Sequence, residues 1–152
     1  MKSSILLTSM VSIAIASACT QNEKPEVKNY WPEAGVTYEI FVQSFADSNG
    51  DRIGDFNGVT EKLDYVKELG ADAIWFMPIM PSPTYHKYDV TDYKAVHPDY
   101  GTLEDFKRLL AEAHKRDIKI VIDMIINHTS NQHPWFLESK SGRDNPYRDY
   151  YV

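Results

Sequence analysis

The sequence is poor in cysteine, in positive charge and in long apolar runs. Its 152 residues include one cysteine, Cys19, so no disulfide can form within the chain and no later residue supplies a thiol. The formal net charge of −6 argues against nucleic acid as a partner and against electrostatic attachment to anionic lipid. No internal repeat or low-complexity segment is present. What remains has the composition of a globular protein, with 43% apolar residues.

The first residues resemble a bacterial export signal. Lys2 precedes an apolar run at 5–16, which is shorter than the roughly 20 residues that span a bilayer, and small residues lead to Cys19. We predict a signal peptide over 1–18 and lipidation of Cys19, because small residues before a cysteine resemble the lipobox, although Ala16 stands where Leu or Val is usual. The alternative is an ordinary cleaved signal in which Cys19 has no role.

The segment 19–29 is polar and charged and contains Pro25, which predicts a flexible lipidated tether. In Gram-negative lipoproteins, Asp directly after the modified cysteine favours the inner membrane. Thr20 occupies that place here. The resemblance therefore implies an exported protein that contacts the outer membrane through a lipid anchor only.

The rest of the chain alternates between strand and helix patterns. Residues 37–45, 71–77 and the stretch 119–128 are rich in strand formers. Helices are expected over 56–69 and after Thr102, whose spacing to an acid three residues later is typical of an N-cap. Their apolar positions recur at threes and fours: Phe56, Val59, Leu63, Val66, Leu69, then Leu103, Phe106, Leu109, Leu110, Ala113. This order predicts βαβ units and a parallel α/β sheet.

The stretch 119–128 organises the chain. It begins as an apolar run, which predicts a strand buried on both faces, yet it carries Asp123 and ends in Asn127 and His128. An unpaired buried carboxylate is costly, and ligands bind at the carboxyl ends of parallel strands. We therefore expect a site there. The alternative is a strand end capped by polar groups, and His128 has only His133 nearby, which is not a zinc pattern.

Oxygen side chains recur at every second position between residues 47 and 55. With one backbone carbonyl filling the gap, they would offer the hard oxygen ligands that Ca²⁺ prefers. The alternative is a solvated turn rich in Asx residues. The expected calcium ligands are Asp47, Asn49, Asp51, the carbonyl of Ile53, and Asp55.

The predicted loop at 79–101 holds a second polar and aromatic cluster. Its members are Tyr85, His86, Tyr88, Asp89, Asp92 and Tyr93. A loop at the carboxyl end of a parallel strand is typical of a binding surface. A long loop that packs itself down with tyrosines would show the same composition, and spacing does not choose between the two.

Taken together, these motifs resemble the α-amylase family, glycoside hydrolase family 13. The similarity lies in residues 70–78, 88–93 and 123–128, in the loop at 47–55, and in the segment opening at 133–136. It implies the amino-terminal part of a (β/α)₈ TIM barrel over 30–128, with strands one to three and helices one and two. Residues 129–152 would begin the inserted B domain.

The resemblance also implies residue roles. Tyr88 would stack on the sugar beside the scissile bond, His128 would hydrogen-bond it and His86 would line the same region. Asp123 would orient neighbouring groups. Many α-amylases have Gly where Lys87 stands, so the sequence here is closer to cyclomaltodextrinases and neopullulanases.

The implied activity is retaining hydrolysis of α-1,4-glucosidic bonds in starch or maltooligosaccharides. Retaining hydrolysis uses two carboxylates about 5–5.5 Å apart. In the family these follow strands four and five, so this chain is expected to lack catalytic residues and to be inactive alone. The alternatives are a cyclomaltodextrinase or neopullulanase, or a non-catalytic member that binds glucan.

Overall fold

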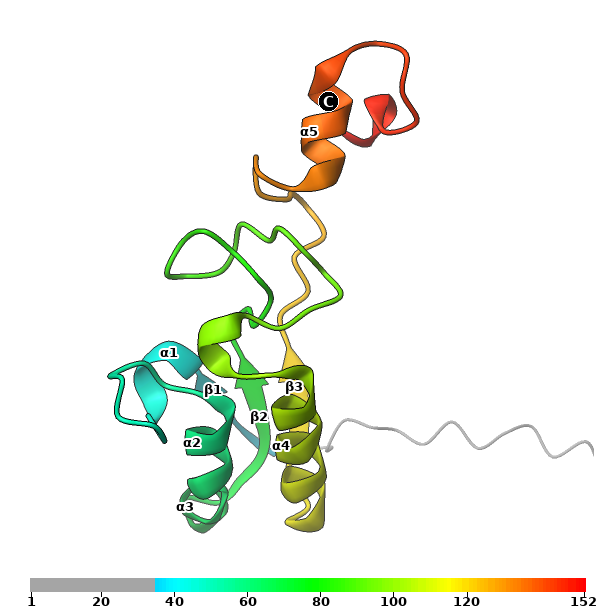
Figure 1. The fold of residues 1–152 in the computed structure, drawn as a ribbon. Coiled ribbons are helices and arrows are strands. Elements are labelled where there is room, and N and C mark those ends of the chain that lie inside the picture. Colours follow the sequence, from blue (N-terminus) through cyan, green and yellow to red (C-terminus); the bar gives the residue numbers. More distant parts are fainter. Residues whose placement is uncertain (1–34) are drawn as a thin grey trace, which may run out of the picture. The chain divides into compact units, whose positions relative to one another are not determined.

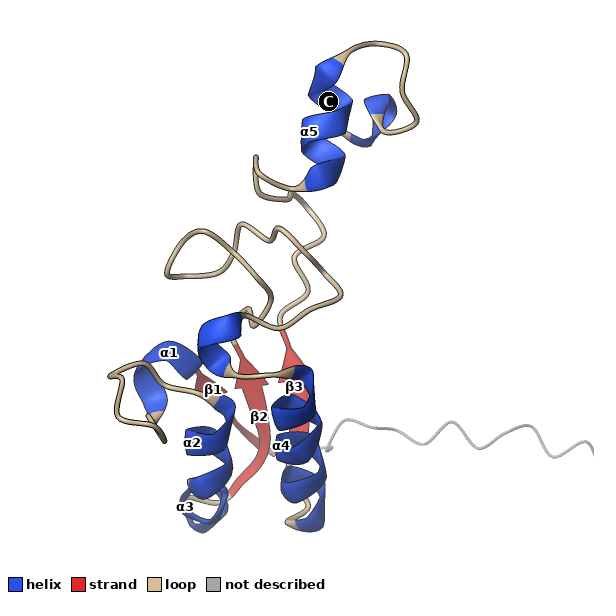
Figure 2. Ribbon diagram, in the orientation of Figure 1, coloured by secondary structure: helices blue, strands red, loops and turns tan. Residues whose placement is uncertain are grey.

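The computed structural model describes residues 35–152, so the predicted signal peptide, Cys19 and the tether lie outside the described residues. Three strands form one sheet in the order β1-β2-β3: β1 Val36–Ile40, β2 Ala71–Phe76 and β3 Lys119–Ile122. Both pairings are parallel, so the strand ends marked by arrowheads in Figure 2 share one edge. The predicted parallel α/β fold is confirmed.

Helices connect the strands and lie against one face of the sheet (Figure 1). α2 Phe56–Glu61 and α3 Leu63–Glu68 follow β1, and α4 Leu103–Lys115 follows β2. The predicted start of α4 is confirmed: the Thr102 hydroxyl accepts from the Asp105 amide, and the Asp105 carboxylate accepts from the Thr102 amide. Beyond β3 come α5 Pro134–Ser141 and the short turn η2 Arg148–Tyr150.

The first strand is shorter than predicted. The expected strand 37–45 ends at residue 40, and Val42–Phe45 forms the short helix α1. The amide of Gly54 donates to the carbonyl of Gln43 at 2.8 Å, and a Cβ on Gly54 would lie 1.9 Å from the carbonyl oxygen that begins α1. This close return of the chain overrides the strand propensity of the segment.

Two further boundaries differ from expectation. The helix predicted at 56–69 is divided at Lys62, whose ψ of 5° interrupts the α-helical geometry, and Gly70 follows with a positive φ of 83°. The third strand stops at Ile122. The prediction that it is buried on both faces is wrong in the described part of the chain, because Ile122 is 41% exposed and β3 pairs there with β2 alone.

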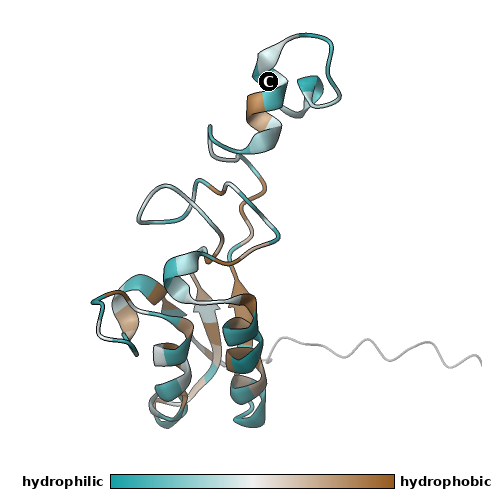
Figure 3. Ribbon diagram, in the orientation of Figure 1, coloured by the Kyte–Doolittle hydropathy of each residue, from teal (hydrophilic) through white to brown (hydrophobic). Residues whose placement is uncertain are grey.

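The apolar core fills the space between the sheet and the helices, where brown segments meet in Figure 3. Phe56 contacts the rings of Tyr100 and Phe106 at centroid distances of 5.9 and 5.2 Å. Tyr100 belongs to the turn η1 Pro98–Tyr100. Within residues 35–152, no helix has the length and apolar character to cross a membrane.

Strand register determines which side chains face away from the helices. Trp75 is the direct partner of Glu39 on β1 and of Val121 on β3, so these three residues share one face. Ile40 and Phe76 are partners on the opposite face and are almost fully buried in the core. The face that bears Trp75 therefore leads to the carboxyl edge without contributing to this core.

Candidate functional site

Asp123 lies directly after β3, at the carboxyl edge of the sheet. Its amide donates to the carbonyl of Phe76 at 3.1 Å, which continues the line of β3 by one residue. Its carboxylate accepts two hydrogen bonds from different elements. Trp75 Nε1 donates to Oδ1 at 2.8 Å, and the Tyr88 hydroxyl donates to Oδ2 at 2.7 Å. The expected cost of an unpaired carboxylate is thus avoided by two donors.

Tyr88 joins the loop after β2 to this carboxylate. The hydrogen bond to Asp123 raises the pKa of Tyr88 to about 12, and burial of the phenol adds to the increase. His128 approaches from the segment after β3, with Nε2 3.1 Å from the Tyr88 carbonyl oxygen. The structure therefore brings Tyr88, Asp123 and His128 together at one edge.

His86 lies beside Tyr88 in the same loop. Its Nδ1 accepts from the Tyr88 amide at 3.1 Å, and the two rings lie 6.0 Å apart. Because Nδ1 is an acceptor, the neutral imidazole carries its proton on Nε2. His86 thus supports the backbone of Tyr88 and has one ring N–H left to donate.

The loop from 82 to 89 is closed by its own polar groups. Asp89 accepts from the hydroxyls of Ser82, at 2.5 Å, and of Thr84. Lys87 is 4% exposed and has a positive φ of 65°; its Nζ donates to the Thr84 carbonyl at 3.1 Å and lies 5.8 Å from the ring centroid of Tyr100. Burial lowers the pKa of Lys87 despite the nearby carboxylates. This loop is therefore internally braced while it presents Tyr88 at the edge.

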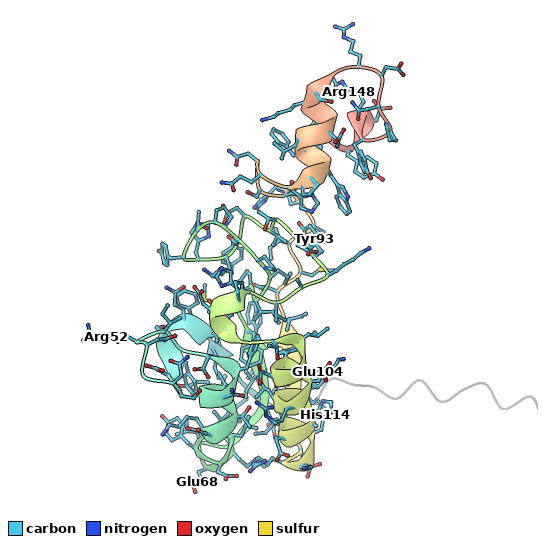
Figure 4. All side chains as sticks on the ribbon, viewed as in Figure 1. Arg52, Glu68, Tyr93, Glu104, His114 and Arg148 are labelled. Atoms are coloured by element: carbon cyan, nitrogen blue, oxygen red, sulfur yellow. The ribbon has the colours of Figure 1, made fainter. Side chains whose placement is uncertain are left out.

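Tyr93 supports the segment that carries His128. Its hydroxyl lies 2.7 Å from the Ile125 carbonyl and 3.0 Å from the His128 carbonyl, to which it can donate. Its ring stacks on that of Trp135 with a centroid distance of 6.2 Å. Figure 4 labels Tyr93 beside the segment that leads from β3 to α5. Tyr93 thus fits the alternative in which loop tyrosines pack the chain, whereas Tyr88 faces the site.

Sequence reasoning assigned no role to Trp75 and none specifically to Tyr93. The residue type of Trp75 gave no reason to pair it with Asp123, because that pairing depends on the register of β2 against β3. Strand alternation does place Trp75 and Asp123 on one face once Val121 is known to be the partner of Trp75. The sequence alone does not specify the register of β2 against β3, which is needed to predict the contact between Trp75 and Asp123.

Two hollows adjoin these residues. One of about 360 Å³ is lined by Trp75, Tyr88, Asp123 and the following residues up to Asn127. The other, of about 390 Å³, is lined mainly by apolar and aromatic groups. Its lining includes Tyr93, His128, Trp135, Tyr150 and Tyr151. Aromatic rings beside hydrogen-bonding groups suit ligands that have both apolar and polar faces.

The loop at 47–55 folds as consecutive Asx turns. Asp47, Asn49 and Asp51 each accept, through Oδ1, the backbone amide two residues ahead, at 2.7–2.9 Å. Hydrogen bonds from the amides of Gly50 and Arg52 lower the pKa of Asp47. The Asx-turn alternative therefore describes this local geometry, and its amide donors favour the ionised form of Asp47.

The donor chemistry of this loop suits Ca²⁺ in part. Asp47, Asn49, Asp51 and the Ile53 carbonyl offer hard oxygens in a short segment. Asp55 is the N-cap of α2 and accepts from the Ser48 hydroxyl and the Gly58 amide. No three His, Cys, Asp or Glu side chains among residues 35–152 cluster as a metal site would require, so the amide and carbonyl oxygens would have to complete the set.

Comparison with known proteins gives a consistent result. Residues 39–152 match the family model for the alpha amylase catalytic domain. The chain is 57% identical over 122 residues to Alpha-amylase 3 of Dictyoglomus thermophilum, which covers 80% of this chain and 24% of that protein. It is 52% identical over 124 residues to an oligo-1,6-glucosidase of Parageobacillus thermoglucosidasius, covering 81% and 22%.

A solved structure shows the same similarity in three dimensions. The crystal structure of the α-amylase from H. orenii superposes with a TM-score of 0.77 and 55% identity, over 80% of this chain and 27% of that chain. The chain thus spans about a quarter of the length of these relatives. Its sheet and helices are an amino-terminal part of a TIM barrel, as the resemblance implied. The chain belongs to the α-amylase family.

Proposed function

We propose that this chain forms the amino-terminal part of a retaining hydrolase that cleaves α-1,4-glucosidic bonds in starch or maltooligosaccharides. The observation that carries the proposal is the gathering of Tyr88, Asp123 and His128 at the carboxyl edge of the sheet. That edge is where parallel α/β folds place their ligands. Family membership supports glycoside hydrolysis as the class of reaction.

In this proposal each residue acts on one glucose ring. The Tyr88 ring packs on the apolar C–H face of the sugar, because a saccharide presents C–H groups on its faces and hydroxyls at its rim. His86 and His128 donate or accept at those hydroxyls. Asp123 orients Tyr88 and the sugar. None of these groups is assigned a proton transfer or nucleophilic attack, so residues 1–152 alone are expected to be inactive.

The choice of linkage rests on the loop after β2. Relatives include both an α-amylase and an oligo-1,6-glucosidase, so overall similarity does not distinguish α-1,4 from α-1,6 linkages. The Asp-Asn-Gly-Tyr-Asp pattern of α-1,6-glucosidases is missing here, which favours α-1,4 bonds. The second candidate function is that of a cyclomaltodextrinase or neopullulanase, because Lys87 occupies the place where many α-amylases have Gly.

A substrate panel tests this proposal. The complete protein that carries these residues would be assayed with linear maltooligosaccharides, cyclic maltodextrins and α-1,6-linked isomaltooligosaccharides. We expect fastest release of sugars from the linear α-1,4 substrates, and none from residues 1–152 alone. Faster cleavage of the cyclic substrates would favour the second candidate, and absence of any hydrolysis by the complete protein would refute an enzymatic role.

We also propose that the loop at 47–55 binds Ca²⁺ through Asp47, Asn49, Asp51, Ile53 and Asp55. Calcium would neutralise the loop's carboxylates and hold its turns. Asp51→Ala should lower the melting temperature of the complete protein in calcium but not in excess chelator. Asp144→Ala, an exposed acid outside the loop, is the control. Equal melting of wild type and Asp51→Ala with and without chelator would refute the metal role.

Localisation is proposed from the amino-terminal sequence alone. An exported protein lipidated at Cys19 should partition with outer-membrane fractions and take up a labelled fatty acid. Cys19→Ala should abolish both. Release of the wild-type protein as an unlipidated species would instead favour an ordinary cleaved signal.

A further inference from the structure

Trp75 occupies a distinctive place on the sheet. Its neighbours along β2, Ile74 and Phe76, are fully buried in the core, whereas the Trp75 side chain lies on the opposite face and the residue is 40% exposed. Val121 is its direct partner on β3. Asp123 lies two residues beyond Val121, so strand alternation directs Asp123 to the same face as Trp75.

The indole makes a specific polar contact from this position. Its Nε1 lies 2.8 Å from Oδ1 of Asp123, while the Tyr88 hydroxyl lies 2.7 Å from Oδ2. A donor from the sheet thus holds one carboxylate oxygen, and a donor from the loop holds the other. Two donors on different oxygens define the plane of the carboxylate. Each oxygen retains a further acceptor site for a sugar hydroxyl or a third donor.

A purely structural role explains this placement less well. A core tryptophan would be enclosed by apolar groups, and any large apolar residue could replace it. Trp75 lies on the face opposite to the helices, which in a TIM barrel faces the barrel interior. Apolar packing there would not require its single N–H to meet an acid, and it does meet one. An indole is rigid, with only two side-chain torsions, so a strand residue can fix a hydrogen-bond partner with little lost entropy.

We infer that Trp75 is a positioning residue for Asp123 and, through that carboxylate, for the Tyr88 ring. The inference rests on the proposed function, because it assigns Trp75 a part in presenting the sugar-stacking tyrosine. Trp75 itself performs no chemical step. Its contribution is to keep the Asp123 carboxylate in the orientation at which Tyr88 can donate to it.

The contact can be tested without any activity measurement. In the complete protein labelled with nitrogen-15 at tryptophan, the indole N–H signal missing from Trp75→Phe identifies Trp75. Exchange of this proton with solvent should be slow in the wild type and at least about tenfold faster in Asp123→Ala, because the variant removes the acceptor. Other tryptophan signals serve as internal controls. Unchanged exchange in Asp123→Ala would overturn the inference.

Kinetics on maltooligosaccharides test the positioning role. Trp75→Phe keeps the aromatic packing and removes the donor, so kcat should fall on the order of tenfold while KM changes by less than about twofold. Adding Trp75→Phe to Asp123→Ala should cause less than about a twofold further loss, because the partner is already gone. Tyr65→Phe, on the exposed side of α3, should leave both constants unchanged.

The outcomes separate the two proposals. If the wild type hydrolyses α-glucans but Trp75→Phe is fully active, the positioning role is wrong and the proposed function stands. If Trp75→Phe and Asp123→Ala lower kcat by independent, multiplying factors, Trp75 does not act through Asp123 and the inference is again overturned. A wild type without activity removes the proposed function, and the positioning role in catalysis falls with it.

Discussion

Replacing Asp123 with Asn should allow the Tyr88 phenol to ionise close to its ordinary pKa of 10.0, instead of about 12. The amide has the shape of the carboxylate but no charge. It can also donate an N–H to the phenolate, which the carboxylate cannot do. The substitution therefore removes the main reason why the charged form of Tyr88 is disfavoured, and leaves burial as the smaller one.

The expected size follows from the pKa shift. Raising the pKa from 10.0 to about 12 corresponds to roughly 3 kcal/mol between the two protonation states. A hydrogen bond to an ionised group contributes about 1.5–3 kcal/mol, so the single 2.7 Å contact accounts for most of the effect. At about pH 11, roughly a tenth of Tyr88 should be ionised in the wild type and close to nine tenths in Asp123→Asn.

A rapid jump to about pH 11 measures this fraction before alkaline unfolding begins. The near-ultraviolet absorbance of phenolate reports all tyrosines, and subtracting the trace of a variant that also carries Tyr88→Phe isolates Tyr88. Asp92→Asn, an acid in the same loop with no contact to the phenol, is the matched control. If the Tyr88 contribution were the same in wild type and Asp123→Asn, the hydrogen bond would not control this group.

The same pKa shift predicts how stability depends on pH. Because the folded-state pKa is raised, the contribution of the Tyr88–Asp123 contact is complete below about pH 10 and is lost as the pH rises through about 12. The destabilisation caused by Tyr88→Phe should therefore be constant near neutral pH and should disappear in strong alkali. A difference that grows with pH would contradict the assigned direction.

Substitutions at three sites, with comparison variants for the first two, test the scaffold through unfolding measurements. Gly54→Ala should lower the unfolding free energy by more than about 3 kcal/mol, because its Cβ would lie 1.9 Å from a backbone oxygen. Gly142→Ala is the control: a Cβ there would meet nothing within 4 Å, so the unfolding free energy should change by less than about 0.5 kcal/mol. Equal shifts in melting temperature for the two variants would contradict this prediction. Lys87→Gly should leave the unfolding free energy nearly unchanged, because relief of about 1 kcal/mol of left-handed backbone strain offsets the lost hydrogen bond from Nζ. Lys87→Val should lower the unfolding free energy by about 2 kcal/mol. The opposite order of the two denaturant midpoints would refute the strain argument. Asp105→Ala should lower the unfolding free energy by about 1 kcal/mol at neutral pH, because it removes the acceptor that caps α4. Hydrogen bonds from Thr102 lower the pKa of Asp105 to about 2, so this loss of stability should fade as the pH falls through about 2. A loss that persists in stronger acid would be inconsistent with an ionised cap.

Local patterns predicted the helix layer well. The spacing of Phe56, Val59, Leu63 and Val66 placed four residues on one face, and all four are fully buried. Helical periodicity depends only on neighbours three and four positions away, so the sequence contains the whole signal. Leu69 fits the same spacing but is 51% exposed, because the helix ends before it and Gly70 redirects the chain.

Long-range contacts explain the wrong boundaries. Residues 42–45 have the composition of a strand, but they form α1 where the backbone at Gly54 approaches from the following loop. Nothing within the segment itself signals that approach. A glycine in the loop marks a place where a close contact is allowed, and only the fold identifies the partner.

In the candidate site too, residue types were predictable from the sequence, whereas the contacts between residues were not. Asp123 and His128 were identifiable because a carboxylate and an imidazole in or beside an apolar strand require an explanation, whereas Tyr88 was singled out only by the family resemblance. Their partners were not identifiable in the same way. Trp75 lies 48 positions before the acid that it contacts, and a tryptophan in a strand is ordinarily explained by packing.

Register is what converts these residue types into a site. A shift of one residue between β2 and β3 would turn Trp75 and Asp123 to opposite faces of the sheet, although every residue identity would be unchanged. The buried face resists such a shift, because Ile74 and Phe76 would then leave the core. The apolar residues that face the helices therefore determine the position of the polar contacts on the other face, and the geometry around Asp123 depends on core residues that never touch it.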